Sequence, residues 1–321
     1  MAVASAECSD PFDLSIVIDL SPATITGRCD ARSRIRAWIR EAASVAPVRC
    51  EIVLASADPA PPALEQDERV PIRFVHVEGG NHYGLKNAGA NATSGRIVLC
   101  TDGDCRPCDG YVATLLRALE NPAVSCVAGV SHYDGDSLLT RFNTAHSWGF
   151  VHCGQEGLDR HTVLAHNVAF RRGVLERDPF GPFLARVGGD RYLTDAVRRH
   201  GHRILLVEGM RIYHEDITYS FAGTLERHLR EHLLPMPYGT PGHRFSLAFT
   251  FASLCFRPWL RVARVWRARH RLGIRPQHAA IALAMNAGYA LFDIGAVMVV
   301  LLSPRRRRQW FEFLIGSGAT A

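Results

Sequence analysis

Residues 97–104 read Ile-Val-Leu-Cys-Thr-Asp-Gly-Asp, an apolar run that ends in two acidic residues separated by one glycine. The apolar half is typical of a buried strand. In an extended chain, residues i and i+2 point to the same side, so Asp102 and Asp104 are expected to lie together. Gly103 permits a tight turn between them. Two adjacent carboxylates repel each other, and a hard cation such as Mg²⁺ or Mn²⁺ relieves that repulsion. A solvated Asp-Gly turn is the competing interpretation.

A second pattern, C-x-x-C from Cys105 to Cys108, follows directly. A structural zinc site needs a second pair of ligands at suitable spacing, and His152 and Cys153 do not supply that spacing. The chain has nine cysteines and no apolar leader at its start, so we expect reduced thiols and no signal peptide.

The surrounding pattern alternates short apolar runs with amphipathic stretches, which predicts an α/β fold with a mostly parallel sheet. Expected strands are Leu14–Ile18, Glu51–Ala55, Ile72–Val77, Arg96–Cys100, Val124–Val130 and Ile204–Val207, and expected helices are 35–42, 82–92, 111–119 and 194–200. In such sheets ligands bind beyond the carboxyl ends of the strands, which is where Asp102 and Asp104 fall.

The positive charge is concentrated near the end of the chain. The net charge is +6, yet residues 221–321 contain 14 arginines and only four acidic residues. A basic segment of this kind suits an anionic surface, either lipid headgroups or nucleic acid. Its arginines lie between apolar runs rather than among stacking aromatic residues, which favours lipid and predicts no nucleic-acid partner.

Residues 14–215 resemble the family 2 glycosyltransferases, which have the nucleotide-sugar-binding GT-A fold. The resemblance depends on four segments in the family's order. Gly84–Gly89 resembles the Ala-Arg-Asn-x-Gly helix, Asp102–Asp104 the D-x-D motif, Asn167–Arg171 the segment on the acceptor side, and Gly188–Thr194 the G-D/E-D-R-x-L-T stretch. Each match is weak alone, and their ordered succession is specific.

The resemblance implies an inverting transfer of one sugar from a nucleoside-diphosphate sugar to an acceptor hydroxyl. Asp102 and Asp104 would hold Mg²⁺ or Mn²⁺ on the donor diphosphate, and His214 would complete that site. Asp190 would be the catalytic base, with a pKa raised by a partly desolvated pocket. The alternatives are a helix N-cap for Asp190 and a packed, purely structural role for His214.

The remaining site residues also follow from the resemblance. Donor binding would involve Ser56, Asp58, Lys86, Asp102 and Gly103, and the acceptor side would involve Asn167 and Arg191. Lys86 is the only lysine in the chain. It is either a diphosphate contact, where the family has arginine, or a solvated helix residue.

The chain departs from the family pattern in several places. The paired acids that hold the nucleotide base are replaced by Ser56 and Ala57, the proline after the first strand by Asp19, and the first acid of the late motif by Gly189. Uridine is therefore only the default nucleoside. The Q-x-x-R-W motif of processive synthases is missing, which favours single addition.

Three parts are expected: a tail at 1–12, the GT-A domain at 13–220, and a basic, membrane-associated helical region at 221–321. Residues 279–302 are long and apolar enough to span a bilayer. Because arginine clusters flank this stretch on both sides, helices lying in the cytoplasmic interface, or a re-entrant hairpin turning near Gly288 or Gly295, are favoured over a true span. A buried hairpin of a soluble domain is the alternative.

The expected location is thus the cytoplasmic face of the cell membrane. The partners would be the inner leaflet and a glycan, lipid-linked or small-molecule acceptor. Two other functions compete: a non-catalytic, membrane-bound relative that binds a glycan, and a nucleotidyltransferase. The latter requires a glycine- and basic-rich loop after the first strand, and Asp19–Pro22 does not provide one.

Overall fold

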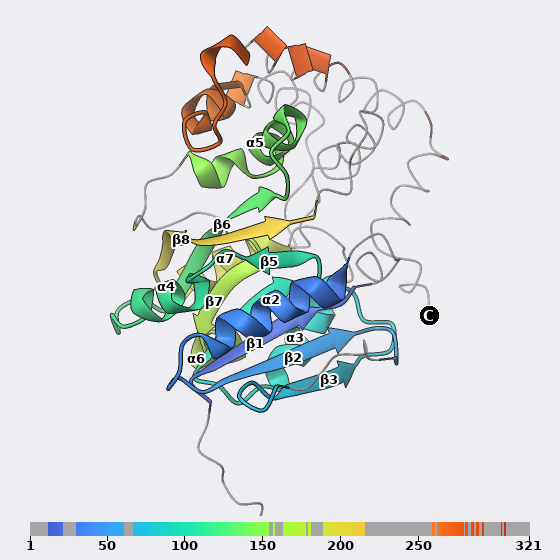
Figure 1. Cartoon of the computed structure of the whole chain (residues 1–321), viewed down its shortest axis with the longest axis vertical. Coiled ribbons are helices and arrows are strands. Elements are labelled where there is room, and N and C mark those ends of the chain that lie inside the picture. The colour runs from blue at the N-terminus through green and yellow to red at the C-terminus, as the bar shows by residue number, and fades with distance from the viewer. Residues whose placement is uncertain are drawn as a thin grey trace, which may run out of the picture.

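The computed structural model describes the sheet and its helices together with part of the C-terminal region (Figure 1). The described residues are 12–21, 30–60, 67–153, 157, 163–177, 179–180, 189–215, 259–260, 262–278, 280–281, 284–285, 287–288, 291, 303 and 305. The predicted tail and most of the predicted membrane segment at 279–302 lie outside them. For Arg191 only the backbone is described.

Eight strands and six α-helices make up the described core. They are β1 (Leu14–Asp19), α2 (Ala31–Ala43), β2 (Cys50–Ser56), β3 (Ile72–His76), α3 (His82–Asn91), β4 (Ile97–Asp102), β5 (Cys105–Pro107), α4 (Tyr111–Ala118), β6 (Cys126–Tyr133), α5 (Leu138–His152), β7 (Asn167–Arg171), α6 (Arg172–Arg177), α7 (Gly189–Arg199) and β8 (Ile204–His214). A short 3₁₀ helix follows at Pro276–His278. All predicted strands and helices are confirmed, although β8 is longer and α7 begins earlier than expected.

The strands form one sheet in the order β3-β2-β1-β4-β7-β6-β8-β5. Four neighbouring pairs are parallel and three are antiparallel, so the sheet is mixed rather than mostly parallel. β7 runs antiparallel to both of its neighbours, β4 and β6, and β5 runs antiparallel to β8 at the edge of the sheet. Because β6 and β8 then run in the same direction as β4, the carboxyl ends of β1, β2, β4 and β8 meet at one edge.

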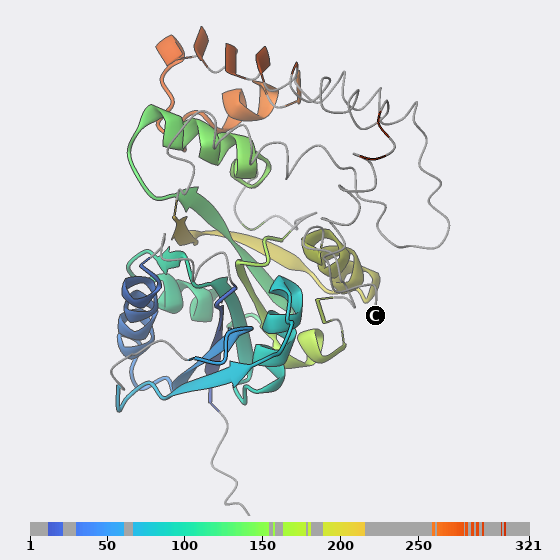
Figure 2. The ribbon, with the colours of Figure 1, turned by 90° about the vertical axis from the view of Figure 1, so that its right-hand side faces the viewer.

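Helices cover both faces of this sheet, α2 and α4 on one and α3, α6 and α7 on the other (Figure 2). The apolar side of α2 carries Ile35, Trp38 and Ile39 into the core, as their spacing predicts. Trp38 also donates its indole N–H to the carbonyl of Cys105 at 3.0 Å. This bond fixes the residue next to the acidic motif against the core.

The described C-terminal residues pack on α5, beyond the β6–β8 half of the sheet (Figure 1). Val265, Ala268 and Leu272 form an apolar cluster with Phe142 and Ala145 of α5. None of the helices in the described ranges has the length and hydropathy needed to cross a bilayer.

Candidate active site

The edge where the strands end carries most of the polar side chains expected from the sequence. Asp19 ends β1, Ser56 ends β2, Asp102 ends β4 and His214 ends β8. Asp19 and Asp102 are direct neighbours in the β1–β4 register. The sheet topology therefore brings together residues that are up to 195 positions apart in the chain.

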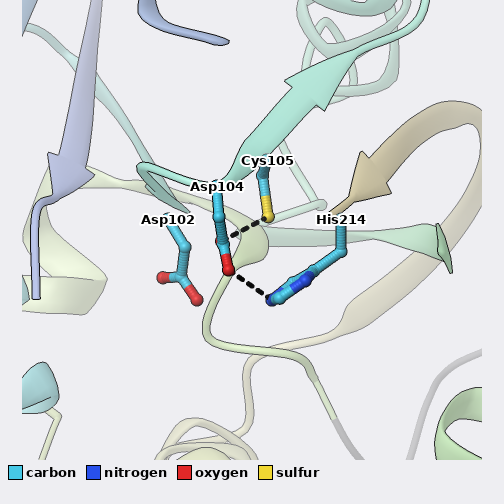
Figure 3. Close-up of side chains that lie close together, drawn as sticks. All are labelled: Asp102, Asp104, Cys105 and His214. Carbon is cyan, nitrogen blue, oxygen red and sulfur yellow. Dashed lines mark hydrogen bonds and ion pairs between the residues drawn. The ribbon is translucent and has the colours of Figure 1, made fainter. Parts of the chain in front are cut away.

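The acidic motif and His214 form one group of possible metal ligands (Figure 3). One ligand atom from each of Asp102, Asp104, Cys105 and His214 lies within 4.8 Å of the others. His214 Nε2 is 3.2 Å from Asp104 Oδ2, and the backbone N–H of Glu215 donates to the Asp104 carbonyl at 3.0 Å. Residues at the end of β8 thus contact both the side chain and the backbone of Asp104.

Behind this group lies a buried ion cluster of Asp19, His82, Lys86 and Asp102. The Lys86 ammonium is 2.9 Å from Asp19 Oδ2 and also contacts Asp102 Oδ1, and both Lys86 and the Asp19 side chain are fully buried. His82 Nδ1 contacts the same oxygen of Asp19. The interpretation of Lys86 as a solvated helix residue was wrong, because its ammonium is enclosed by carboxylates.

Neighbouring charges decide the ionisation of this cluster. Burial alone would raise the pKa of Asp102, but Lys86 and His82 hold it well below its usual value. Burial would likewise lower the pKa of Lys86, yet the carboxylates of Asp102 and Asp19 raise it. The lysine is therefore a permanent cation and Asp102 a permanent anion.

Asp190 lies in the first turn of α7 rather than ahead of the helix as a cap. Burial raises the pKa of its carboxyl, opposed mainly by the charges of His82 and Lys86. The hydroxyl of Tyr83 donates to Asp190 Oδ1 at 3.3 Å. A carboxyl group whose pKa is raised by its surroundings has the property required of a general base that works near neutral pH.

The other donor-side residues lie at the same edge. Ser56 is buried, and its hydroxyl accepts from the backbone N–H of Asp58 at 2.9 Å. Asp58 in turn accepts from Ala60 N–H at 2.9 Å. The N–H of Gly103 donates to the Asp19 carbonyl at 2.9 Å, which ties the acidic turn to β1.

Asn167 is placed differently from the acceptor contact that the resemblance implied. Its side chain is fully buried. The side-chain amide accepts from Tyr111 at 2.6 Å and donates to the carbonyls of Val130 and Met210 at 2.9 and 3.3 Å. These bonds make it a structural link between β7, β6, β8 and α4. The backbone of Arg191 follows Asp190 in α7.

The described cysteines are not joined in disulfides. Cys105 and Cys108 are both free. Burial, reinforced by the charges of Asp104 and Asp102, raises the pKa of Cys105 well above its usual value. A protonated thiol is a poor ligand for a hard cation, so oxygen and imidazole are the relevant donors in the first group.

Sequence reasoning missed three residues of this site. Asp19 was noted only as a departure from the family pattern, while His82 and His166 were not singled out. The His166 ring lies 5.5 Å from that of His214, and burial lowers its pKa to about 3, which keeps it neutral. The sequence signal that could have identified Asp19 is an acidic residue directly at the end of the first apolar strand.

Residues 48–178 match the model of glycosyl transferase family 2. That range contains Lys86, Asp102 and Asp104, whereas Asp19, Asp190 and His214 lie outside it. No curated protein sequence matches the chain.

Among solved structures, the chain is similar to the mannosyltransferase PcManGT from Pyrobaculum calidifontis, in complex with GDP-Man and Mn²⁺. The identity is 15%, the TM-score is 0.53, and the match covers 91% of this chain and 87% of that one. TarS from S. aureus matches with 10% identity and a TM-score of 0.49, over 88% of this chain and 55% of that one. The first likeness shows that this chain shares the fold of that mannosyltransferase.

Proposed function

We propose that the protein is a metal-assisted, inverting glycosyltransferase that moves one sugar from a nucleoside-diphosphate sugar to an acceptor hydroxyl. The observation that carries this proposal is the grouping of Asp102, Asp104 and His214 at the strand ends. Burial raises the pKa of Asp190, and the charges of His82, Lys86 and Asp102 also act on its carboxyl group. Anion neutralisation and proton removal are the two tasks that sugar transfer from a diphosphate requires.

The donor set fits a hard divalent cation. Asp104 and Asp102 offer carboxylate oxygens and His214 an imidazole nitrogen, a combination suited to Mn²⁺ or Mg²⁺. A bound ion would neutralise the negative charge of the departing nucleoside diphosphate. The side chains of Asp104 and His214 are 12% and 13% exposed, so they are partly open to a ligand.

In the proposed reaction Asp190 takes the proton of the acceptor hydroxyl. The acceptor oxygen forms a bond to the anomeric carbon while the bond from that carbon to the phosphate oxygen breaks. Attack opposite the departing diphosphate inverts the configuration. Asp190 suits this role because burial favours its protonated form, which strengthens it as a base.

Ser56, Asp58 and Lys86 are proposed on the donor side, with Arg191 near the acceptor side. The bonded turn of Ser56 and Asp58 lies beyond β2, where the resemblance places the nucleotide base. Uridine is the default nucleoside, since nothing at this turn reproduces the family's paired acids.

The test is a panel of UDP-, GDP- and dTDP-sugars, assayed for transfer and hydrolysis with and without Mn²⁺. Asp104→Ala is expected to lower turnover at least about 100-fold, because the leaving diphosphate loses its counter-charge. Asp109→Ala, which removes an exposed acid just beyond β5, is the matched control. Unchanged turnover in the Asp104 variant would refute the metal role. Donor binding without turnover would instead favour a non-catalytic glycan-binding protein.

The C-terminal region is proposed to bind the anionic inner leaflet, which would place the enzyme at the cytoplasmic face of the membrane near a lipid-linked or envelope glycan. Its described part exposes large apolar side chains: Trp259 is 72% exposed, Leu260 54% and Trp266 48%. The guanidinium of Arg269 lies 4.2 Å from the Trp266 ring centroid. Exposed tryptophans interspersed with arginines are typical of an interfacial segment.

Vesicle co-sedimentation tests this membrane proposal. The full chain is expected to sediment with vesicles that contain phosphatidylglycerol and much less with pure phosphatidylcholine, and high salt should release part of it. A Trp259→Ala/Trp266→Ala variant should bind more weakly than an Asp109→Ala control. Equal sedimentation of both variants would contradict the assignment.

A further inference from the structure

Two groups of cation ligands share one residue. Asp102 belongs both to the outer group with Asp104 and His214 and to an inner group with Asp19 and His82, and in each group the ligand atoms lie within 4.8 Å of one another. A carboxylate has two oxygens and can serve two cations at once. The geometry is thus that of two adjacent cation positions joined by the Asp102 carboxylate.

The inner position already contains a cation. Lys86 Nζ contacts Asp102 Oδ1 and lies 2.9 Å from Asp19 Oδ2 and 3.3 Å from His82 Nδ1. The side chains of Lys86 and Asp19 are fully buried. The ammonium therefore sits among the same atoms that would otherwise ligate a metal ion.

The buried carboxylate of Asp19 needs the neighbouring ammonium of Lys86 to be stable. Its Oδ1 is buried and has no hydrogen-bond partner among the described residues, so its stabilisation comes through Oδ2. An ionised carboxylate that is enclosed without a cation costs several kcal/mol. Removing the ammonium would leave Asp19 and Asp102 as two buried, adjacent anions.

We propose that Lys86 is a built-in cation that permanently fills the inner of two cation positions bridged by Asp102, which leaves the outer position for a single divalent ion. Lys86 is in this view a positioning residue: it holds Asp102 in place through the shared carboxylate. The inference rests on the proposed function only for the occupant of the outer position.

The test counts bound Mn²⁺ on the full chain by isothermal titration and by electron paramagnetic resonance. We expect one ion on the wild-type protein and two on Lys86→Ala, with the second lost again in Lys86→Ala/Asp19→Asn. Lys86→Arg keeps the charge and should bind one ion. Two ions on the wild-type protein, or no gain in Lys86→Ala, would overturn the proposal.

The folding of Lys86→Ala supplies a second measurement. In metal-free buffer this variant should unfold at a lower temperature than the wild type, and either Mn²⁺ or ethylammonium should restore most of the loss. Lys86→Met fills the same space without charge and should not be rescued by either. Equal rescue of both variants would contradict a cation position. If Lys86→Ala does not fold at all, titration of the wild type to high Mn²⁺ still tests the proposal, because the number of bound ions must stay at one.

The two proposals fail in different ways. If the wild type binds no Mn²⁺ while Lys86→Ala gains one ion that Asp19→Asn removes, the built-in cation stands and the outer metal role falls. If Asp104→Ala abolishes turnover and the wild type binds two ions, the glycosyltransferase stands and the built-in cation falls.

Discussion

Asp190 is a carboxyl group in the first turn of α7 whose surroundings disfavour its charge. Burial raises its pKa in the folded protein. A group whose folded pKa lies above its unfolded value contributes stability at low pH, and that contribution is lost as the pH rises through the folded pKa. At neutral pH the ionised Asp190 is therefore a cost to stability, which is typical of a residue kept for its chemistry.

Asp190→Asn should separate these two effects. We expect turnover to fall about 100- to 10,000-fold, because the acceptor proton has no base. The melting temperature should rise, and the rise should grow between acidic and neutral pH, because the buried charge is removed. Transfer assays and thermal unfolding across pH measure both. Asp195→Asn, at an exposed position of the same helix, is the control and should change neither turnover nor the melting temperature. A lower melting temperature for Asp190→Asn would show instead that the charge of Asp190 stabilises the protein.

Asp102, Asp104 and Asp190 could be singled out in the sequence because each belongs to a short motif, and His214 because the resemblance implies a metal ligand there. It did not predict how Asp19 and Lys86 meet, because their contact depends on the register of β1 against β4 and on the placement of α3. Register is set by long-range pairing and has no local pattern. The buried pair was therefore visible in the sequence only as an unexplained aspartate and an isolated lysine.

At the level of elements, the close packing of α3 on β1 sets the geometry of the ion cluster. Gly89 allows this approach, because a Cβ at that position would lie 2.4 Å from Val17 Cγ1 of β1. His82 and Lys86 are on the same helix, and Asp19 ends the same strand. A small displacement of α3 would therefore separate the ammonium from its carboxylates.

Gly89→Ala is expected to destabilise the protein by about 1–3 kcal/mol through overpacking. It should also weaken Mn²⁺ binding, since Asp102 is shared with the outer group. Gly173→Ala in α6 is the control: nothing lies within 4 Å of its Cβ, so alanine should stabilise that helix by about 0.5–1 kcal/mol. Denaturant unfolding and metal titration measure these effects. If Gly89→Ala is as stable as the wild type, α3 can move away from β1 without loss of stability.

Local patterns predicted β1 to β4 and α2 to α4 because apolar periodicity and strand propensity agree in those segments. They did not predict α5, whose sequence mixes Thr, Asn, His and Ser with only moderate amphipathicity. Nor did they predict that β7 runs antiparallel, since strand direction depends on the path of the chain and not on its local composition. Local sequence patterns therefore could not predict that the sheet is mixed.

For the whole molecule, the described C-terminal segment is attached to the sheet through α5 and β8. Arg271 is 2.6 Å from Glu208 of β8 and donates to the carbonyl of His152 at 3.0 Å. Arg141 of α5 donates to the carbonyl of Gly273 at 2.9 Å. An apolar cluster of α5 and residues 265–274 lies beneath these bonds. The sequence assigned this region to a separate basic part and contained no signal for the docking.

Phe142→Ala tests this attachment. Phe142 is 5% exposed and packs against the C-terminal segment, so its removal should cost about 3–5 kcal/mol of local packing energy. Because the loss falls on the α5 contact, trypsin should cut the arginine-rich residues 261–275 early, while amide exchange in β1 and β4 stays slow. Leu115→Ala in α4 removes a buried side chain from the opposite face and should lower the melting temperature without this early cleavage. Early cleavage in both variants would show that the segment is released only by global unfolding, and the docked region would then be part of the same cooperative unit as the sheet.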